Sequence, residues 1–220
     1  MVEQDPSYTM HAFWIVVGLV VLAGVVIRLV LTRQRQVQAL REIAKRHRFN
    51  YSSEDLIGLH ERYQNLDLIR QGHNRHAWNV VYGAVETGLI ALFRYRYDVG
   101  FGANRSSRQW WVAVVETSRA YRHWHAFPKG GHQAMSDGRK WGRFRIHTYH
   151  ESTVPELIDA GVDTTLANAP PDYQWEVRGP LIAVAAPMRP DPQVPEQLIT
   201  VACELAQRLA DHSRETERDE

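Results

Sequence analysis

The 220-residue sequence has little of what several classes of protein require. Its single cysteine, Cys203, cannot form an internal disulfide bond, which agrees with a domain in a reducing compartment. Basic residues exceed acidic residues by one, and a net charge of +1 argues against a nucleic-acid-binding protein. The motifs G-x-S-x-G, H-E-x-x-H, G-x-x-x-x-G-K and C-x-x-C are missing, which argues against the enzyme families that they define.

One long apolar run is present. It covers residues 12–32, AFWIVVGLVVLAGVVIRLVLT, and its 21 residues reach about 31 Å as a helix, close to the roughly 30 Å hydrocarbon core of a bilayer. The one charged residue, Arg28, lies near the end of the run, where its long side chain reaches the lipid headgroups. We therefore predict a transmembrane helix over residues 12–32.

The charges that flank this run predict its orientation. Basic flanks remain in the cytoplasm, so we expect residues 1–11, which contain no lysine or arginine, to form a short extracytoplasmic tail. A cleaved signal peptide is the rival interpretation, but no basic residue precedes the run and no A-x-A-like site follows it. The basic residues that follow the run, and that assign the rest of the chain to the cytoplasm, are Arg33, Arg35, Arg41, Lys45, Arg46 and Arg48.

Residues 33–48 predict a basic juxtamembrane helix, because Val37, Leu40 and Ile43 fall on one face and the charges lie elsewhere. Two interpretations of the basic residues stay open. In one they contact anionic lipid headgroups, each contributing about 1 kcal/mol near the surface. In the other they form a solvated stem that only orients insertion. The lipid bilayer is an expected partner of the chain either way.

We predict one soluble domain over residues 49–212 and a disordered acidic tail over residues 213–220. Acidic residues after Ser53 predict a short helix over 54–63, and Pro155 favours a helix over 154–168. Leu198, Val201 and Leu205 fall on one face of an amphipathic helix that is predicted from Asp191 or Pro195 to about His212 and ends the domain. Alternating or β-forming stretches predict strands over 66–71, 76–85, 89–97, 109–116, 121–127, 143–150, 173–178 and 181–186.

The order of these segments predicts the fold class. Consecutive strands joined by short turns favour antiparallel pairing, and the helices near the two ends of the domain cover one face of the sheet. We therefore expect an α+β protein: an N-terminal transmembrane helix, then one domain with a mainly antiparallel sheet, helices on one face and a C-terminal amphipathic helix.

Three segments carry a resemblance to known proteins. AKRHRFNY at 44–51, NVVYG at 79–83 and FRYRY at 93–97 follow the anchor and the basic helix in that order. This arrangement resembles a loose group of uncharacterised bacterial single-pass membrane proteins with a tethered α+β domain. The resemblance implies a bacterial source, and hence the inner membrane as the location. It implies no activity and no catalytic residue.

The histidines give the one candidate site for chemistry. His123 and His125 are two apart on a predicted strand, so their side chains share a face, a spacing that suits two ligands of Zn²⁺ or a similar metal. His132, His147 or His150 would supply a third ligand. Against a metal site, the same face carries aromatic residues, and a chain with 11 histidines produces such pairs by chance. Histidines half-buried on the sheet are the alternative interpretation.

Three functions follow as hypotheses. The leading one is a non-catalytic module of the inner membrane whose cytoplasmic domain binds a partner protein or the membrane surface, without nucleic acid and without a cofactor. The first alternative is a membrane-tethered metal-dependent hydrolase that uses His123 and His125. The second is a domain that binds anionic lipid through the basic residues of 33–48. Aromatic and basic residues alternate at 94–97, but an amphipathic strand accounts for them as well as a nucleic-acid surface does.

Overall fold

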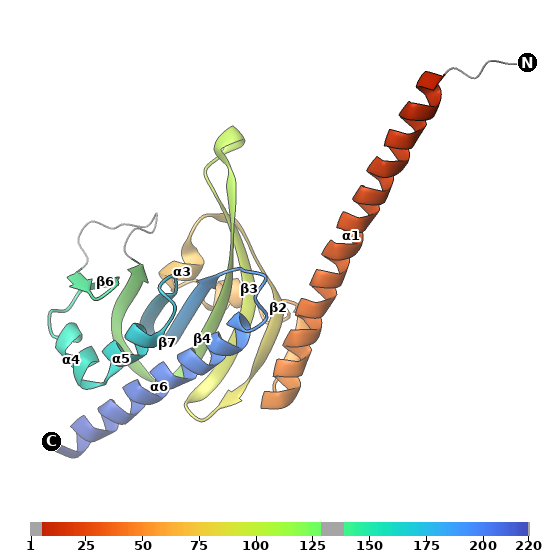
Figure 1. Ribbon diagram of the computed structural model, residues 1–220. Helices are drawn as coiled ribbons and strands as arrows, with labels where there is room; N and C mark the ends of the chain where they lie inside the picture. The colour runs from red at the N-terminus through yellow and green to blue at the C-terminus, as the bar shows by residue number, and fades with distance from the viewer. Residues whose placement is uncertain (1–5, 129–138, 220) are drawn as a thin grey trace, which may run out of the picture. The chain divides into compact units, whose positions relative to one another are not determined.

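The computed structural model describes residues 6–128 and 139–219 (Figure 1). Its helices are α1 (Pro6–His47), α2 (Leu59–Arg62), α3 (Asp67–Arg70), α4 (Thr153–Asp159), α5 (Val162–Asn168) and α6 (Val194–Asp219), with a 3₁₀ turn η1 (Gly102–Asn104). Its strands are β1 (Asn50–Glu54), β2 (His73–Val85), β3 (Gly88–Val99), β4 (Ser106–Pro128), β5 (Arg139–Trp141), β6 (Phe144–Thr148) and β7 (Gln174–Pro187). The chain forms two compact units, Met1–Ala39 and Leu40–Glu220.

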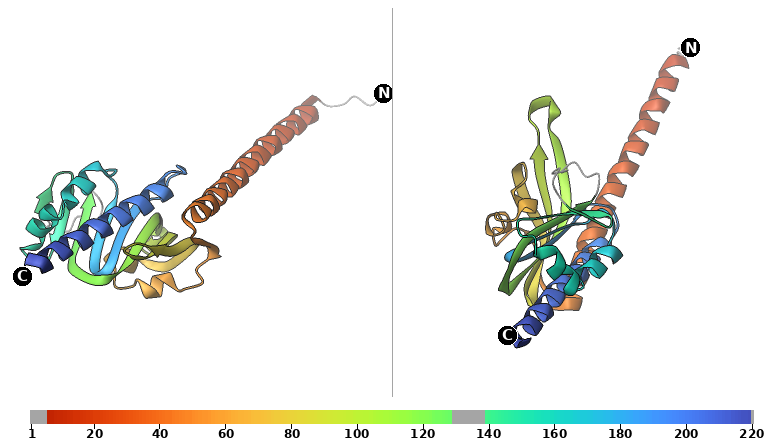
Figure 2. Two further views of the ribbon diagram at one scale, coloured as in Figure 1. Left: turned by 90° about the horizontal axis from the view of Figure 1, so that it is seen from below. Right: turned by 90° about the vertical axis from the view of Figure 1, so that its left-hand side faces the viewer.

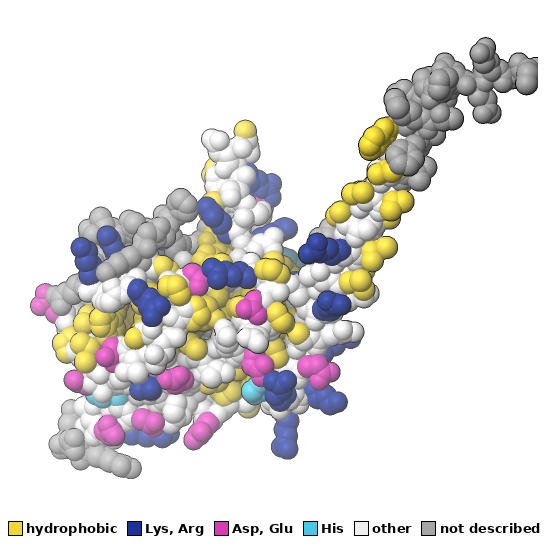
Figure 3. Space-filling model, viewed as in Figure 1, with side chains coloured by type: hydrophobic (Ala, Val, Ile, Leu, Met, Phe, Trp, Pro, Cys, Tyr) yellow, Lys and Arg dark blue, Asp and Glu magenta, His cyan; other side chains and the backbone are white. Residues whose placement is uncertain are grey.

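The first unit contains most of α1. Within α1, the segment Val17–His47 includes a stretch long and apolar enough to cross a membrane. Between residues 19 and 31, the large apolar side chains that the structure describes are exposed, from 47% for Leu31 to 67% for Val20, as expected of a surface that faces lipid. Figure 3 shows hydrophobic side chains along this part of α1. The predicted membrane anchor is therefore present as one candidate spanning helix near the N-terminus.

The second unit is an α+β domain, which confirms the predicted fold class. All strand pairs are antiparallel, in the order β1-β2-β3-β4-β6-β5, with β7 also paired to β4. β4 is 23 residues long and is shared. One of its edges pairs first with β3 and then with β6, while β7 runs along the other edge.

Helices cover both faces of this sheet (Figure 2). On one face, α4, α5 and α6 pack on the larger core cluster, which includes Trp111, Trp124 and Trp175. On the other face, the segment of α2 and α3 covers a second cluster around Phe93 and Tyr95. The prediction of helices on one face holds for the long C-terminal helix, and the two short helices add a layer on the opposite face.

The C-terminal end of α1 belongs to the domain core. Leu40, Ile43 and Ala44 are buried in the larger cluster, although they lie within the predicted juxtamembrane helix. Helix α6 has the predicted amphipathic face, with Leu198 and Leu205 fully buried. It continues to Asp219, so residues 213–219 form the last turns of a helix where the sequence predicts a disordered tail.

Three short elements differ from the predictions. The strand expected at 66–71 is instead helix α3. The helix expected at 54–63 is shorter, because β1 extends to Glu54 and the Asp55 carboxylate accepts the Leu59 N–H to start α2. The helix expected at 154–168 is two helices, α4 and α5, which are divided where Gly161 takes a left-handed conformation with φ of 68°.

A buried carboxylate holds the loop end of the hairpin between β3 and β4. Asp98 has no exposed surface and accepts hydrogen bonds from Ser107, from Asn74 Nδ2 at 3.1 Å and from Arg105 Nε at 3.0 Å. These partners, Ser107 first, lower the pKa of Asp98 to about 2. Beyond Asp98 the hairpin ends in η1, which projects past the rest of the sheet in Figure 1.

Candidate functional site

The site is built around Glu176, a fully buried carboxylate on β7. Glu176 Oε1 accepts the backbone N–H of Asp67 at 2.8 Å, and Oε2 accepts that of Leu68 at 2.9 Å. Both N–H groups belong to the first turn of α3, whose N-cap residue, Leu66, makes no side-chain cap hydrogen bond. Glu176 therefore supplies the acceptors and the negative charge that stabilise the start of α3.

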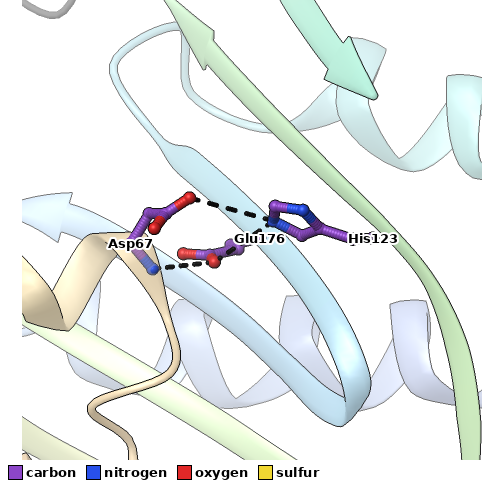
Figure 4. A group of neighbouring side chains, drawn as sticks. All are labelled: Asp67, His123 and Glu176. Atoms are coloured by element: carbon purple, nitrogen blue, oxygen red, sulfur yellow. Dashed lines mark hydrogen bonds and ion pairs between the residues drawn. The ribbon is translucent and has the colours of Figure 1, made fainter. Parts of the chain in front are cut away.

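His123 on β4 lies beside these two acidic residues (Figure 4). Its Nε2 is 3.5 Å from Glu176 Oε1 and 4.0 Å from Asp67 Oδ2. One candidate ligand atom from each of the three side chains lies within 4.8 Å of the others. Among the described residues, β4, β7 and α3 thus bring together one histidine and two carboxylates that are close enough to bind one metal ion.

The charges around this group are partly compensated. Asp67 Oδ1 lies 3.3 Å from Arg70 Nη2 and 3.5 Å from Arg178 Nη1, which leaves Oδ2 as the oxygen nearer His123. Burial alone would raise the pKa of Glu176, but the contact with His123, the charge of His125 and the two backbone N–H groups together lower it. An ionised Glu176 is therefore favoured at neutral pH.

Several nitrogens in the group have no hydrogen bond. Neither ring nitrogen of His123 finds a hydrogen-bond partner among the described residues, and the same holds for His125 Nε2. Both side chains are largely enclosed, with the His123 side chain 13% exposed and His125 8% exposed. Since buried polar atoms in folded proteins nearly always have a partner, the three histidine nitrogens are a cluster of donor or acceptor atoms for which the described residues supply no hydrogen-bond partner.

The two histidines of the predicted pair have different surroundings, because only His123 belongs to the group with Asp67 and Glu176. Both lie on the face of β4 that α3 covers, as their spacing predicts, and His125 stands directly across from Glu176 and from His147 in the strand register. Burial lowers the pKa of His125. His125 contributes no atom to the group of ligand atoms, and His150 is exposed. His132 lies outside the described residues.

Sequence reasoning missed the two carboxylates. Glu176 had a weak signal, because it is a charged residue on the polar face of a predicted strand whose other face is apolar. Asp67 gives no such signal, because the pattern around it predicts a strand and nothing in the spacing connects it to His123. The two acidic residues come together only through the pairing of β4 with β7 and the packing of α3.

Of the six predicted membrane-surface residues, five have described side chains, and all five are exposed. Arg46 makes an ion pair with Glu196 of α6, and the Arg41 guanidinium lies 5.4 Å from the centre of the Tyr51 ring. Both contacts hold the end of α1 on the domain. Arg35, Lys45 and Arg48 are exposed, and the Arg33 side chain lies outside the described set.

A cleft of about 820 Å³ lies on the same face of the sheet, at the other end of α3. Tyr97, Trp110 and Met188 give it apolar walls, and Gln71 and Gln174 give it amide groups. The Tyr97 hydroxyl donates to Gln71 Oε1 at 2.8 Å, which fixes one of these amides. A volume in this range and a mixed lining are typical of sites for small ligands or for inserted side chains.

Comparisons with known proteins give one structural likeness. No protein-family model matches the sequence, and no curated protein matches it. The fold is similar to the crystal structure of the mycobacterial trehalose monomycolate transport factor A, TtfA, with a TM-score of 0.60 and 14% sequence identity. The match covers 79% of this chain and 94% of that one. At this identity the likeness shows a shared fold.

Proposed function

We propose that this protein is a membrane-anchored, non-catalytic binding module. In this proposal α1 crosses a bacterial inner membrane once, and the α+β domain binds a protein partner on the cytoplasmic side. The observation that carries the proposal is that α1 includes both an exposed apolar span and core residues of the domain. Residues 33–39 separate the predicted span from Leu40 and reach no more than about 25 Å even when extended, so the domain stays at the membrane surface.

The shared fold with a factor named for trehalose monomycolate transport supports a role beside a membrane transport system. A module held at the membrane suits an accessory of a transporter, because tethering raises the effective concentration of the domain near partners in the same membrane. The cleft beside α3 is the surface that we assign to the partner. Its aromatic walls and fixed amide are the kinds of group that anchor protein interfaces.

Photo-crosslinking in cells tests the partner. A photoreactive residue at Gln109, which is exposed at the cleft, is expected to give one specific crosslinked product that mass spectrometry identifies as a membrane transport protein. The matched control is the same residue at Asp211, which is exposed on α6. The proposal is contradicted if the two positions give the same products or if neither gives a product.

A topology reporter tests the orientation independently. A reporter that is active only outside the cytoplasm, fused after Glu220, is expected to stay silent, and the same reporter fused to the N-terminus is expected to be active. The reverse result would assign the domain to the other side of the membrane. It would also move any partner into a different compartment.

A second candidate function is a membrane-tethered metal-dependent hydrolase, which the His123 and carboxylate group favours. Bis-p-nitrophenyl phosphate and p-nitrophenyl acetate are suitable probes for the purified protein with Zn²⁺ or Mn²⁺. Hydrolysis that is lost in His123→Asn but kept in His147→Asn would support this candidate. The anionic-lipid alternative rests on fewer residues, because Arg41 and Arg46 already have partners within the domain.

A further inference from the structure

We propose that Asp67, His123 and Glu176 bind one divalent transition-metal ion, with Zn²⁺ as the expected metal. The ion would join three elements that are far apart in the sequence: the start of α3, the second half of β4 and the first half of β7. This proposal does not rest on the proposed binding function, since it concerns how α3 is fixed to the sheet.

The distances favour an ion over direct hydrogen bonds. A charged hydrogen bond between imidazole and carboxylate is about 2.7–2.9 Å long, whereas His123 Nε2 lies 3.5 Å from Glu176 Oε1 and 4.0 Å from Asp67 Oδ2. Ligand atoms bound to one Zn²⁺ at about 2.1 Å in tetrahedral geometry are about 3.4 Å apart. The His123–Glu176 separation is therefore close to the edge of a tetrahedron of ligands, and the His123–Asp67 separation is about 0.6 Å longer.

The hydrogen-bonding state of His123 points the same way. Both of its ring nitrogens are buried, and neither has a hydrogen-bond partner within the described parts of the chain. A histidine whose only role was structural would be expected to donate to a backbone carbonyl or a carboxylate at normal length. A bound metal ion would be the partner of His123 Nε2, for which the described residues supply no hydrogen-bond partner.

The surroundings of the carboxylates also suit a divalent ion. Two carboxylates and an imidazole are a donor set that Zn²⁺ binds, and the imidazole favours a transition metal over Mg²⁺ or Ca²⁺. Glu176 is oriented by the N–H groups of Asp67 and Leu68, the outer contacts that hold a ligand in place. The arginines beside Asp67 occupy its Oδ1 and leave Oδ2 for the metal.

The consequence for the domain is a fixed α3. This helix has only 4 residues, and its first turn is capped by Glu176. An ion bound by Asp67, His123 and Glu176 would be a second link between α3 and the sheet. Gln71, the residue after α3, lines the cleft. Metal binding would therefore also set the position of one wall of the cleft. Three protein ligands leave a fourth position for water.

Metal analysis of the full-length protein tests the proposal. Protein extracted in detergent and purified without chelators is expected to contain about one equivalent of zinc by mass spectrometry. After removal of the metal with EDTA, titration with Zn²⁺ is expected to restore it, and the melting temperature is expected to rise by roughly 5 °C on rebinding. His123→Asn and Asp67→Asn are each expected to weaken Zn²⁺ binding by at least about tenfold.

The variants are chosen so that a failure to fold does not decide the result. Asp67→Asn keeps the backbone N–H that Glu176 accepts, so α3 keeps its cap and the fold is retained. His147→Asn is the matched control, because His147 is a half-buried histidine on the neighbouring strand β6 outside the ligand group. Wild-type protein with less than a tenth of an equivalent of metal and no Zn²⁺ binding on titration would overturn the proposal, and so would equal metal loss in the control.

Discussion

Asp98 and Glu176 are both carboxylates without exposed surface, yet their surroundings differ. Within the described residues, the side chains that donate to Asp98 come from the hairpin or the strand beside it: Asn74, Arg105 and Ser107. Glu176 depends on residues more distant in sequence. It caps α3 through two backbone N–H groups, and beside it stands a histidine with unmet ring nitrogens. Asp98 thus has hydrogen-bond donors from neighbouring segments, whereas Glu176 lies beside ring nitrogens that have no hydrogen-bond partner among the described residues.

The difference separates a structural charge from a candidate site. A buried carboxylate with an arginine and two neutral donors has its hydrogen-bonding needs supplied and holds a loop in place. A buried carboxylate beside unpartnered imidazole nitrogens keeps capacity for another ligand. Removal of each carboxylate should therefore have different consequences, which the following experiments compare.

The largest effect is expected from Glu176→Ala. The substitution leaves the N–H groups of Asp67 and Leu68 without their acceptor and removes the carboxylate beside His123, and removal of one partner from a buried charged group costs about 3–5 kcal/mol in the free energy of unfolding. Urea unfolding followed by tryptophan fluorescence measures this loss. Glu176→Gln should lose less, because the amide oxygen still accepts one N–H.

A loss in Glu176→Ala that is no larger than in Asp98→Asn would remove the distinction between the two carboxylates. Hydrogen exchange provides a second measurement. In Glu176→Gln the amides of 67–70 should exchange faster while those of 98–107 stay unchanged, because the two carboxylates support separate segments.

An intermediate effect is expected from acid at Asp98. Its folded pKa, about 2, lies below the ordinary value near 4, so its contribution to stability is present above pH 4 and is lost as the pH falls toward 2. The urea midpoint of the wild-type protein should fall across this window. Asp98→Asn should flatten that part of the pH profile, and an unchanged slope would show that other carboxyl groups dominate.

The smallest effect is expected from Arg105→Ala. Arg105 pairs with Asp98 but its own side chain is half exposed, so water replaces part of what it supplies. We expect faster amide exchange over 99–106 at the hairpin with no measurable change in global unfolding. A global loss as large as that of Asp98→Asn would mean that the arginine, and not the hydroxyl and amide donors, satisfies the buried carboxylate.

Much of the fold could be predicted from local pattern. The apolar run, the alternating strands and the face of α6 are properties of neighbouring residues, and the structure has an apolar helix, strands and an amphipathic helix there. Helix α3 could not be predicted in this way. Its start depends on Glu176, a residue from the last strand, so the local signal at 66–71 favours a strand and a tertiary contact overrides it.

The candidate site divides in the same manner. The spacing of His123 and His125 correctly predicts that both lie on one face of a strand, because alternation is local. Which of the two meets a carboxylate depends on the register of β4 with β7 and on where α3 lies, and neither can be read from spacing. The sequence therefore predicts one member of the group, His123, and the fold supplies Asp67 and Glu176.

The shared strand β4 has a consequence for the order in which the chain is made. β4 ends at Pro128, but β7, which pairs along one of its edges, begins only at Gln174. During synthesis the N-terminal helix and β4 leave the ribosome before β7. Until β7 is made, the backbone groups of the apolar segment 111–115 that pair with β7 have no partner strand. An open apolar edge pairs readily with other chains. Chains that end before residue 174 should therefore aggregate more readily than the complete chain, because β7 is missing from that edge of β4.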